Sequence, residues 1–115
     1  MELSVTLDGS GSVAETGELR AWLHDARIRE VERVTQETTA PKPGEQGPTL
    51  LAILTIILGS RALVELARSL HRYIEARRPK VKLTIKTRKK LIEIDCTNPP
   101  PLDELVKEAK FLADD

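Results

Sequence analysis

Residues 80–97, with the sequence KVKLTIKTRKKLIEIDCT, carry the clearest pattern in the chain. Apolar and polar side chains alternate on both sides of Arg88-Lys89, which is typical of two strands that each bury one face. When Leu83 is placed opposite Ile94, the apolar positions of both strands match and a lysine lies opposite an aspartate. Both faces agree on this register, so we predict a β-hairpin with a two-residue turn. The turn lacks glycine and asparagine, which predicts a local cost.

The residues before the hairpin predict a strand, a helix, a second strand and a loop. Residues 3–7 alternate between apolar and polar side chains, which indicates a half-buried strand. Residues 18–26 place apolar side chains on one helical face, and Gly17 weakens an earlier start near Val13. A strand within residues 29–37 is favoured by β-branched residues, although valines three positions apart also fit a helix. Residues 39–48 contain three prolines and two glycines, so we predict a mobile loop.

The longest periodic segment covers residues 49–78, between Pro48 and Pro79. We predict a helix there, which Gly59-Ser60 bends or splits in two. Its first part, residues 50–58, is apolar nearly all round, so we expect it to be covered on both sides. Its second part has an apolar stripe opposite a charged face. Residues 102–112 predict a further amphipathic helix at the end of the chain.

Together these elements predict the α+β class. Their order is β-α-β-α-β-β-α, which indicates a two-layer domain in which helices cover a four-stranded sheet. The 115 residues suit one domain, and the 40% of hydrophobic residues suffice for a core. We therefore expect a single domain over residues 1–115.

Composition argues against several classes of function. Eighteen basic and eighteen acidic residues give a net charge of zero, which argues against a nucleic-acid binder that is basic throughout. The single cysteine, Cys96, excludes an intramolecular disulfide and a cysteine-based zinc site. No apolar run has the length of about 20 residues that spans a bilayer, and no leader segment is visible. We therefore expect a cytoplasmic protein.

Candidate catalytic residues are few and poorly spaced. Ser10, Ser12, His24 and His71 include nucleophiles and bases, but no known hydrolase motif connects them. Cys96 alternates inward in the second strand of the hairpin, which indicates a core residue. We expect no catalytic residue, no metal and no cofactor, and hence no enzymatic activity.

Basic residues gather where the long predicted helix meets the hairpin. One interpretation is a solvated edge whose lysines discourage pairing with other strands. The other is a docking patch for an acidic protein, nucleic acid or anionic lipid. A protein leads among these because the chain has few aromatic side chains for base stacking. The candidate partner-binding residues, named here the basic band, are Arg77, Arg78, Lys80, Lys82, Lys86, Arg88, Lys89 and Lys90.

The apolar run at residues 50–58 is a second candidate surface. It is either the central helix of the core or a partly exposed helix that packs against another subunit or an effector protein. Burial of uncovered aliphatic surface is worth about 25 cal/mol per Å², so even a modest patch would drive a homodimer. The candidate self-association residues are Ile53, Leu54, Ile56, Ile57 and Leu58.

The order of these features resembles a known family. An acidic, alternating first strand precedes the helix segment ELRAWL at residues 18–23, and the Pro/Gly loop and an aliphatic segment ending in Leu58-Gly59-Ser60 follow. The sequence YIEARRP at residues 73–79 then leads into the basic hairpin. Nearly the whole chain is thus similar to the bacterial effector-associated constant component domains. The turn at residues 87–90 departs from the Asp-Gly-like turns expected in relatives.

The resemblance implies a small non-enzymatic module of bacterial conflict, or immunity, systems. Such domains accompany effectors such as caspase-like or trypsin-like peptidases and nucleotide-dependent signalling proteins, and are thought to couple recognition to effector recruitment through protein contacts. The family offers no catalytic residue to carry over. We therefore expect a protein-interaction adaptor. The alternative is a small nucleic-acid-binding module that uses the basic hairpin, and its binding would weaken steeply with salt.

Overall fold

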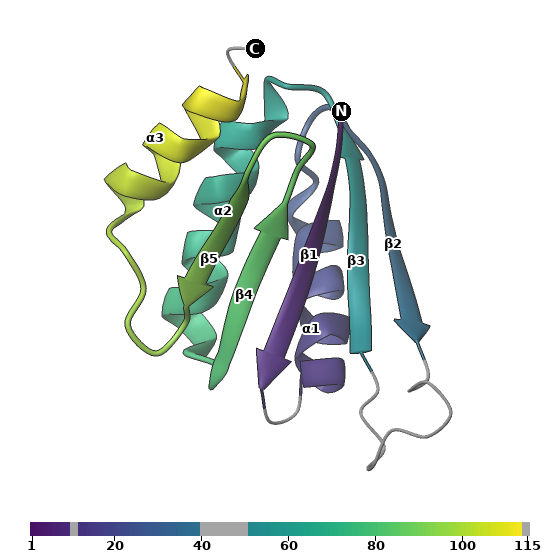
Figure 1. Cartoon of the computed structure of the whole chain (residues 1–115). Coiled ribbons are helices and arrows are strands. Elements are labelled where there is room, and N and C mark those ends of the chain that lie inside the picture. The colour runs from purple at the N-terminus through teal and green to yellow at the C-terminus, as the bar shows by residue number, and fades with distance from the viewer. Residues whose placement is uncertain (10–11, 40–50, 114–115) are drawn as a thin grey trace.

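The computed structural model describes residues 1–9, 12–39 and 51–113. Within these ranges five strands form one antiparallel sheet, and three helices cover one of its faces (Figure 1). The α+β class is therefore confirmed. In chain order the elements are β1 (Glu2–Gly9), α1 (Ser12–Ala26), β2 (Val31–Thr39), β3 (Leu51–Leu58), α2 (Ala62–Arg77), β4 (Val81–Lys86), β5 (Leu91–Asp95) and α3 (Leu102–Ala113). The predicted loop at residues 39–48 lies outside the described residues, apart from Thr39 at the end of β2.

The strand order across the sheet is β2-β3-β1-β4-β5, so the first strand of the chain lies at its centre. Val5 in β1 pairs with Leu54 in β3 and with Ile85 in β4, which aligns inward-facing side chains across three strands. Leu3, Val5 and Leu7 are buried against the helices, as their alternation predicted.

The segment predicted as the first half of a long helix is instead a strand, and the four-stranded sheet and its element order are wrong for the same reason. Along β3, Leu54, Ile56 and Leu58 are buried beneath the helices, while Ile53 and Ile57 point to the other face and are half-buried. β3 lies between two neighbouring strands inside the sheet, which pair with its backbone on both sides. Its length of eight residues and its isoleucines are typical of a strand.

Only the second half of the predicted helix is helical, and it forms α2. Its apolar stripe is buried against the sheet, and the helix ends directly before Pro79, as predicted. Arg78 takes the left-handed conformation with φ of 42° and donates its backbone N–H to the carbonyl of Ile74 at 2.8 Å. This closing bond satisfies one carbonyl of the last turn.

The hairpin of β4 and β5 has the predicted register. Leu83 pairs with Ile94, and Lys82 pairs with Asp95. The side chain of Thr87 explains how the turn forms without glycine or asparagine, because its Oγ1 accepts hydrogen bonds from the backbone N–H groups of Lys89 and Lys90 at 3.3 and 3.1 Å. Arg88 and Lys89 are not among the described residues with positive φ, so the turn avoids the predicted cost.

A β-bulge reconciles the valine spacing with a strand in β2. Val31 pairs with Leu58, but Arg33 pairs with the adjacent Ile57, so Glu32 is an extra residue in the ladder. This insertion lets Val31 and Val34, three positions apart, both pack against the core. The strand interpretation of residues 29–37 is confirmed, and the strand is β2, at one edge of the sheet.

Two polar contacts fix α1 against α2. The indole Nε1 of Trp22 donates to the backbone oxygen and the Oγ of Ser69, at 3.2 and 3.1 Å. Tyr73, which is fully buried, donates its hydroxyl proton to the carboxylate of Glu15 and stands edge-on to the Trp22 ring at 5.8 Å. These bonds hold α1 at a defined place over β1, β2 and β3.

Candidate protein-interaction surfaces

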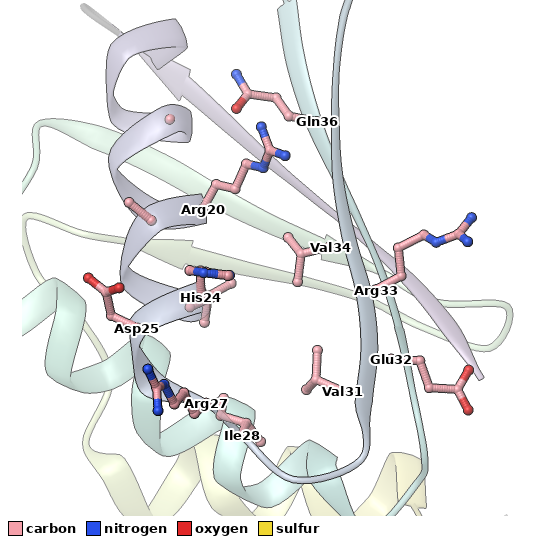
Figure 2. A pocket seen from close by; sticks show the side chains of 13 residues that line it. Arg20, His24, Asp25, Arg27, Ile28, Val31, Glu32, Arg33, Val34 and Gln36 are labelled. Carbon is pink, nitrogen blue, oxygen red and sulfur yellow. The ribbon is translucent and has the colours of Figure 1, made fainter.

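A groove of about 590 Å³ lies between α1 and β2 (Figure 2). Its floor is apolar, since Leu23 is buried and Ile28, Val31 and Val34 are half-buried and pack against the core. One wall is α1, which the Trp22 and Tyr73 contacts fix, and the other is the edge strand β2. The groove will be called the α1–β2 groove.

Positive charge dominates the interior of the α1–β2 groove. Arg20 extends from α1 across the groove toward Gln36 of β2 (Figure 2). The carboxylates of Asp25 and Glu32 point away from the space between the helix and the strand (Figure 2). Among the ion pairs of the described residues none includes Arg20, which is exposed. Its guanidinium therefore presents charge that no carboxylate of the described chain neutralises.

The outer edge of β2 is the second open feature. β2 has nine residues and forms its ladder with β3 alone, so its other side carries no strand in the described sheet. The opposite edge strand, β5, has only five residues. Backbone groups along a free edge are ready to pair with another extended chain.

The basic band lies around the end of α2 and the hairpin, and carboxylates of the chain form ion pairs with half of its residues. Arg77 forms hydrogen bonds of 3.2 and 3.1 Å with the carboxylate of Glu15, and lies 3.9 Å from a carboxylate oxygen of Glu18. The other three intramolecular pairs are Arg78 with Glu75 at 3.7 Å, Lys82 with Glu93 at 2.8 Å, and Lys90 with Glu108. The exposed remainder is Lys80, Lys86, Arg88 and Lys89, of which Lys89 also has an interaction partner. The sequence analysis identified the cluster of basic residues but not the acidic residues that pair with them.

The five candidate self-association residues do not form one surface. Leu54, Ile56 and Leu58 lie in the core, and only Ile53 and Ile57 face the side of the sheet that the helices leave open. The prediction that these residues lie on a helix exposed in several directions is wrong. They lie on a strand, which alternates its side chains between two faces. Self-association stays a prediction, restricted to Ile53 and Ile57.

The candidate catalytic residues are placed as follows. His24 lines the α1–β2 groove, and Nε2 of His71 lies 3.6 Å from a carboxylate oxygen of Glu75 on the same helix. Cys96 is buried, as predicted, and its burial raises the thiol pKa to about 11, which disfavours the reactive thiolate. Ser10 lies outside the described residues, and Ser12 begins α1. Over the described ranges, no group of three or more His, Cys, Asp or Glu side chains could hold a metal ion.

The α1–β2 groove is the feature that sequence reasoning missed. Val31 and Val34, three positions apart, fitted a helix as well as a strand, so their spacing did not predict the bulge that shapes the groove. The distance between β2 and Arg20 could not be predicted from the sequence.

None of the helices in the described part of the chain is long and apolar enough to cross a membrane.

The fold and these surfaces define a small α+β protein, in which an antiparallel sheet with helices on one face leaves a groove and a strand edge open. A family model, Effector Associated Constant Component 1, matches residues 8–112. The chain belongs to this family, and the resemblance found in the sequence is confirmed. A search of curated proteins and a search of solved structures each found no match. The family name describes a component associated with effectors, which implies a protein partner in general terms.

Proposed function

We propose that the chain is a non-enzymatic adaptor that binds a protein partner and couples recognition to an effector in a bacterial conflict system. The observation that carries this proposal is the α1–β2 groove, which combines an apolar floor with the unneutralised charge of Arg20. Its volume falls within the range of about 300–1,000 Å³ that is typical of binding pockets. Membership of the effector-associated family supports a partner of the effector type.

The chemistry of the groove supports binding rather than catalysis. Its lining includes no serine, threonine, cysteine, lysine or tyrosine, so its potential side-chain nucleophiles are carboxylates and the imidazole of His24. The carboxylates of Asp25 and Glu32 point outward, which leaves His24 as the only titratable base directed toward the interior (Figure 2). Arginine and aliphatic side chains are typical of a recognition surface.

The ion pairs of the basic band weigh against the rival function, nucleic-acid binding. Phosphate contacts require cations that are free to replace the counterions of the nucleic acid, and Arg77, Arg78, Lys82 and Lys90 already pair with carboxylates of the chain. The exposed Lys80, Lys86 and Arg88 leave a smaller patch for phosphate.

Binding to the proteins encoded by neighbouring genes tests the adaptor proposal. Isothermal titration with each purified neighbour should show a complex that survives 0.5 M salt in part, because the groove floor is apolar. The variant Val34→Asp should weaken this complex, and Lys86→Glu should not. Both residues lie in strands, and circular dichroism checks that each variant folds. Loss of binding in Lys86→Glu alone, or tight binding of DNA or RNA that collapses with salt, would favour the nucleic-acid alternative.

A further inference from the structure

We infer that the α1–β2 groove binds an extended, acidic segment of its partner, which pairs with the outer edge of β2 as an added strand. This inference rests on the proposed function and specifies the chemistry of the partner. It assigns the main-chain hydrogen bonds to β2, an apolar contact to Val34 and a charge contact to Arg20.

The composition of β2 suits pairing with another strand. Edge strands that avoid partners carry charged side chains, above all lysine, or proline, β-bulges or inward-pointing charges, or are very short. β2 has nine residues with the sequence VERVTQETT, which contains neither lysine nor proline and is rich in β-branched side chains. Its Arg33 and Glu37 pair with Ile57 and Ile53, so their side chains lie on the open face and not inward. Its bulge lies at the Val31 end, which leaves the regular ladder from Arg33 onward straight enough to accept a partner. Addition of a strand at such an edge is a recurring mode of peptide recognition.

The two faces of β2 determine which partner side chains enter the groove. Val34 and Gln36 pair with the buried Ile56 and Leu54, so both project on the helix-covered side of the sheet, toward α1 (Figure 2). In an added strand, alternate side chains would project to the same side and enter the groove. Two such side chains are two positions apart, and they would lie beside Val34 and Gln36 respectively.

Charge complementarity makes the occupant acidic. The side chain next to Val34 meets the apolar floor and is best aliphatic. The side chain next to Gln36 meets Arg20, which extends across the groove at this level and has no carboxylate partner in the described chain (Figure 2). Arg27 and Arg33 also line the groove and have no ion pair there. Arg27 lies directly after α1, where helix carbonyls offset its charge, and Arg33 points away from the groove (Figure 2). The groove therefore favours an aliphatic residue and an acidic residue separated by one position.

Selection from a displayed library of random ten-residue peptides, with the full chain immobilised, tests the inference. The expected consensus has an aspartate or glutamate two positions from a valine, isoleucine or leucine. Fluorescence anisotropy of the selected peptide should then show that Arg20→Glu weakens binding by at least about tenfold. Arg72→Glu is the matched control, since it makes the same charge change at an exposed position of α2 and should leave affinity within about twofold.

Backbone pairing has its own readout, which a purely electrostatic contact would not give. In the bound strand every second peptide N–H points to β2, so N-methylation of successive peptide bonds should abolish binding at alternate positions only. Hydrogen exchange of the β2 amides, followed by NMR, should slow when the peptide binds.

Four results would overturn the inference: no peptide is selected, the consensus lacks an acid, Arg20→Glu binds as tightly as the wild type, or the N-methyl scan shows no period of two. If neighbouring proteins still bind and Val34→Asp still weakens them, the adaptor proposal stands and only the extended acidic segment is excluded. If the peptide binds as expected but no neighbouring protein does, the groove chemistry stands and the effector role fails.

Discussion

The hydroxyl group of Tyr73 donates a hydrogen bond to the carboxylate of Glu15, although the two residues are 58 positions apart. The same carboxylate accepts two hydrogen bonds from the guanidinium of Arg77, and that guanidinium lies 6.0 Å from the centre of the Tyr73 ring. Glu15 is near the start of α1, and both of its partners are on α2. This cluster fixes the helix that forms one wall of the α1–β2 groove, so it connects the core to the candidate site.

Removal of either hydrogen-bonding group should destabilise the fold. Hydrogen bonds to a charged group contribute about 1.5–3 kcal/mol, so Tyr73→Phe and Glu15→Gln should each lower the free energy of unfolding by about 1–3 kcal/mol. Glu18→Gln is the control, because Glu18 is exposed and its carboxylate lies 3.9 Å from Arg77, which predicts a change within about 1 kcal/mol. Urea denaturation measures all three. Equal losses in Glu15→Gln and Glu18→Gln would show that the hydrogen-bonded carboxylate of Glu15 stabilises the fold no more than the exposed carboxylate of Glu18.

The same cluster predicts an acid-sensitive component of stability. The hydrogen bonds from Arg77 hold the pKa of Glu15 below its usual 4.5, with help from Tyr73 and against the effect of partial burial. The unfolded chain therefore binds this proton more readily than the folded chain. The contribution is complete well above pH 4.5 and is lost as the pH falls through the folded value. Urea melts across this range should show a shallower loss of stability in Glu15→Gln than in the wild type. Parallel curves would contradict the assignment.

The hairpin and the helix face of α2 could be predicted because their signals are local. Alternation in residues 80–97 had one register that satisfied both strands, and the structure has that register. Residues 50–58 were different, since a continuous apolar run of this length has no periodicity that separates a central strand from a buried helix. The isoleucines favoured a strand, but the run was read together with the helix that follows Gly59.

The candidate site was beyond sequence reasoning for a related reason. The cations of the basic band were visible, but their partners Glu15 and Glu108 are distant in the sequence and became visible only in the fold. Conversely, Arg20 was not identified as a candidate, because the sequence around a cation does not show whether it lacks an acidic partner in the fold. The α1–β2 groove depends on where the bulge at Glu32 directs β2, which is a tertiary property.

Alternating substitutions along β3 test the strand directly. Ile56 is buried beneath the helices, so Ile56→Ala should cost about 2–5 kcal/mol of unfolding free energy. Ile57, its neighbour, is half-buried on the open face, and Ile57→Ala should cost less than half as much. Thermal and urea melts of the two variants provide the comparison. Similar costs would indicate that both side chains are covered, for example by a second copy of the chain on the open face.

The hairpin offers a second pair of adjacent residues with opposite environments. Lys82 is exposed and forms its 2.8 Å ion pair with Glu93 in solvent, so Lys82→Ala should cost about 0–1 kcal/mol. Leu83 is fully buried opposite Ile94, and Leu83→Ala should cost about 2–5 kcal/mol. Equilibrium unfolding in urea gives both values. A loss at Lys82 as large as that at Leu83 would mean that the inward face of β4 is misassigned.

Two glycines should respond in opposite directions to the same substitution. Gly17 lies inside α1, where an added methyl group would have no heavy atom within 4 Å, so Gly17→Ala should raise the free energy of unfolding by about 0.5–1 kcal/mol. Gly9 at the end of β1 has φ of 145°, and its added Cβ would lie 2.7 Å from the backbone oxygen of Lys80.

Alanine at Gly9 must therefore shift β4 or change the backbone, and Gly9→Ala should cost about 1–3 kcal/mol. Differential scanning calorimetry should show a higher melting temperature for Gly17→Ala and a lower one for Gly9→Ala. Destabilisation by Gly17→Ala would mean that α1 does not run unbroken from Ser12, and the groove wall would then need a different description.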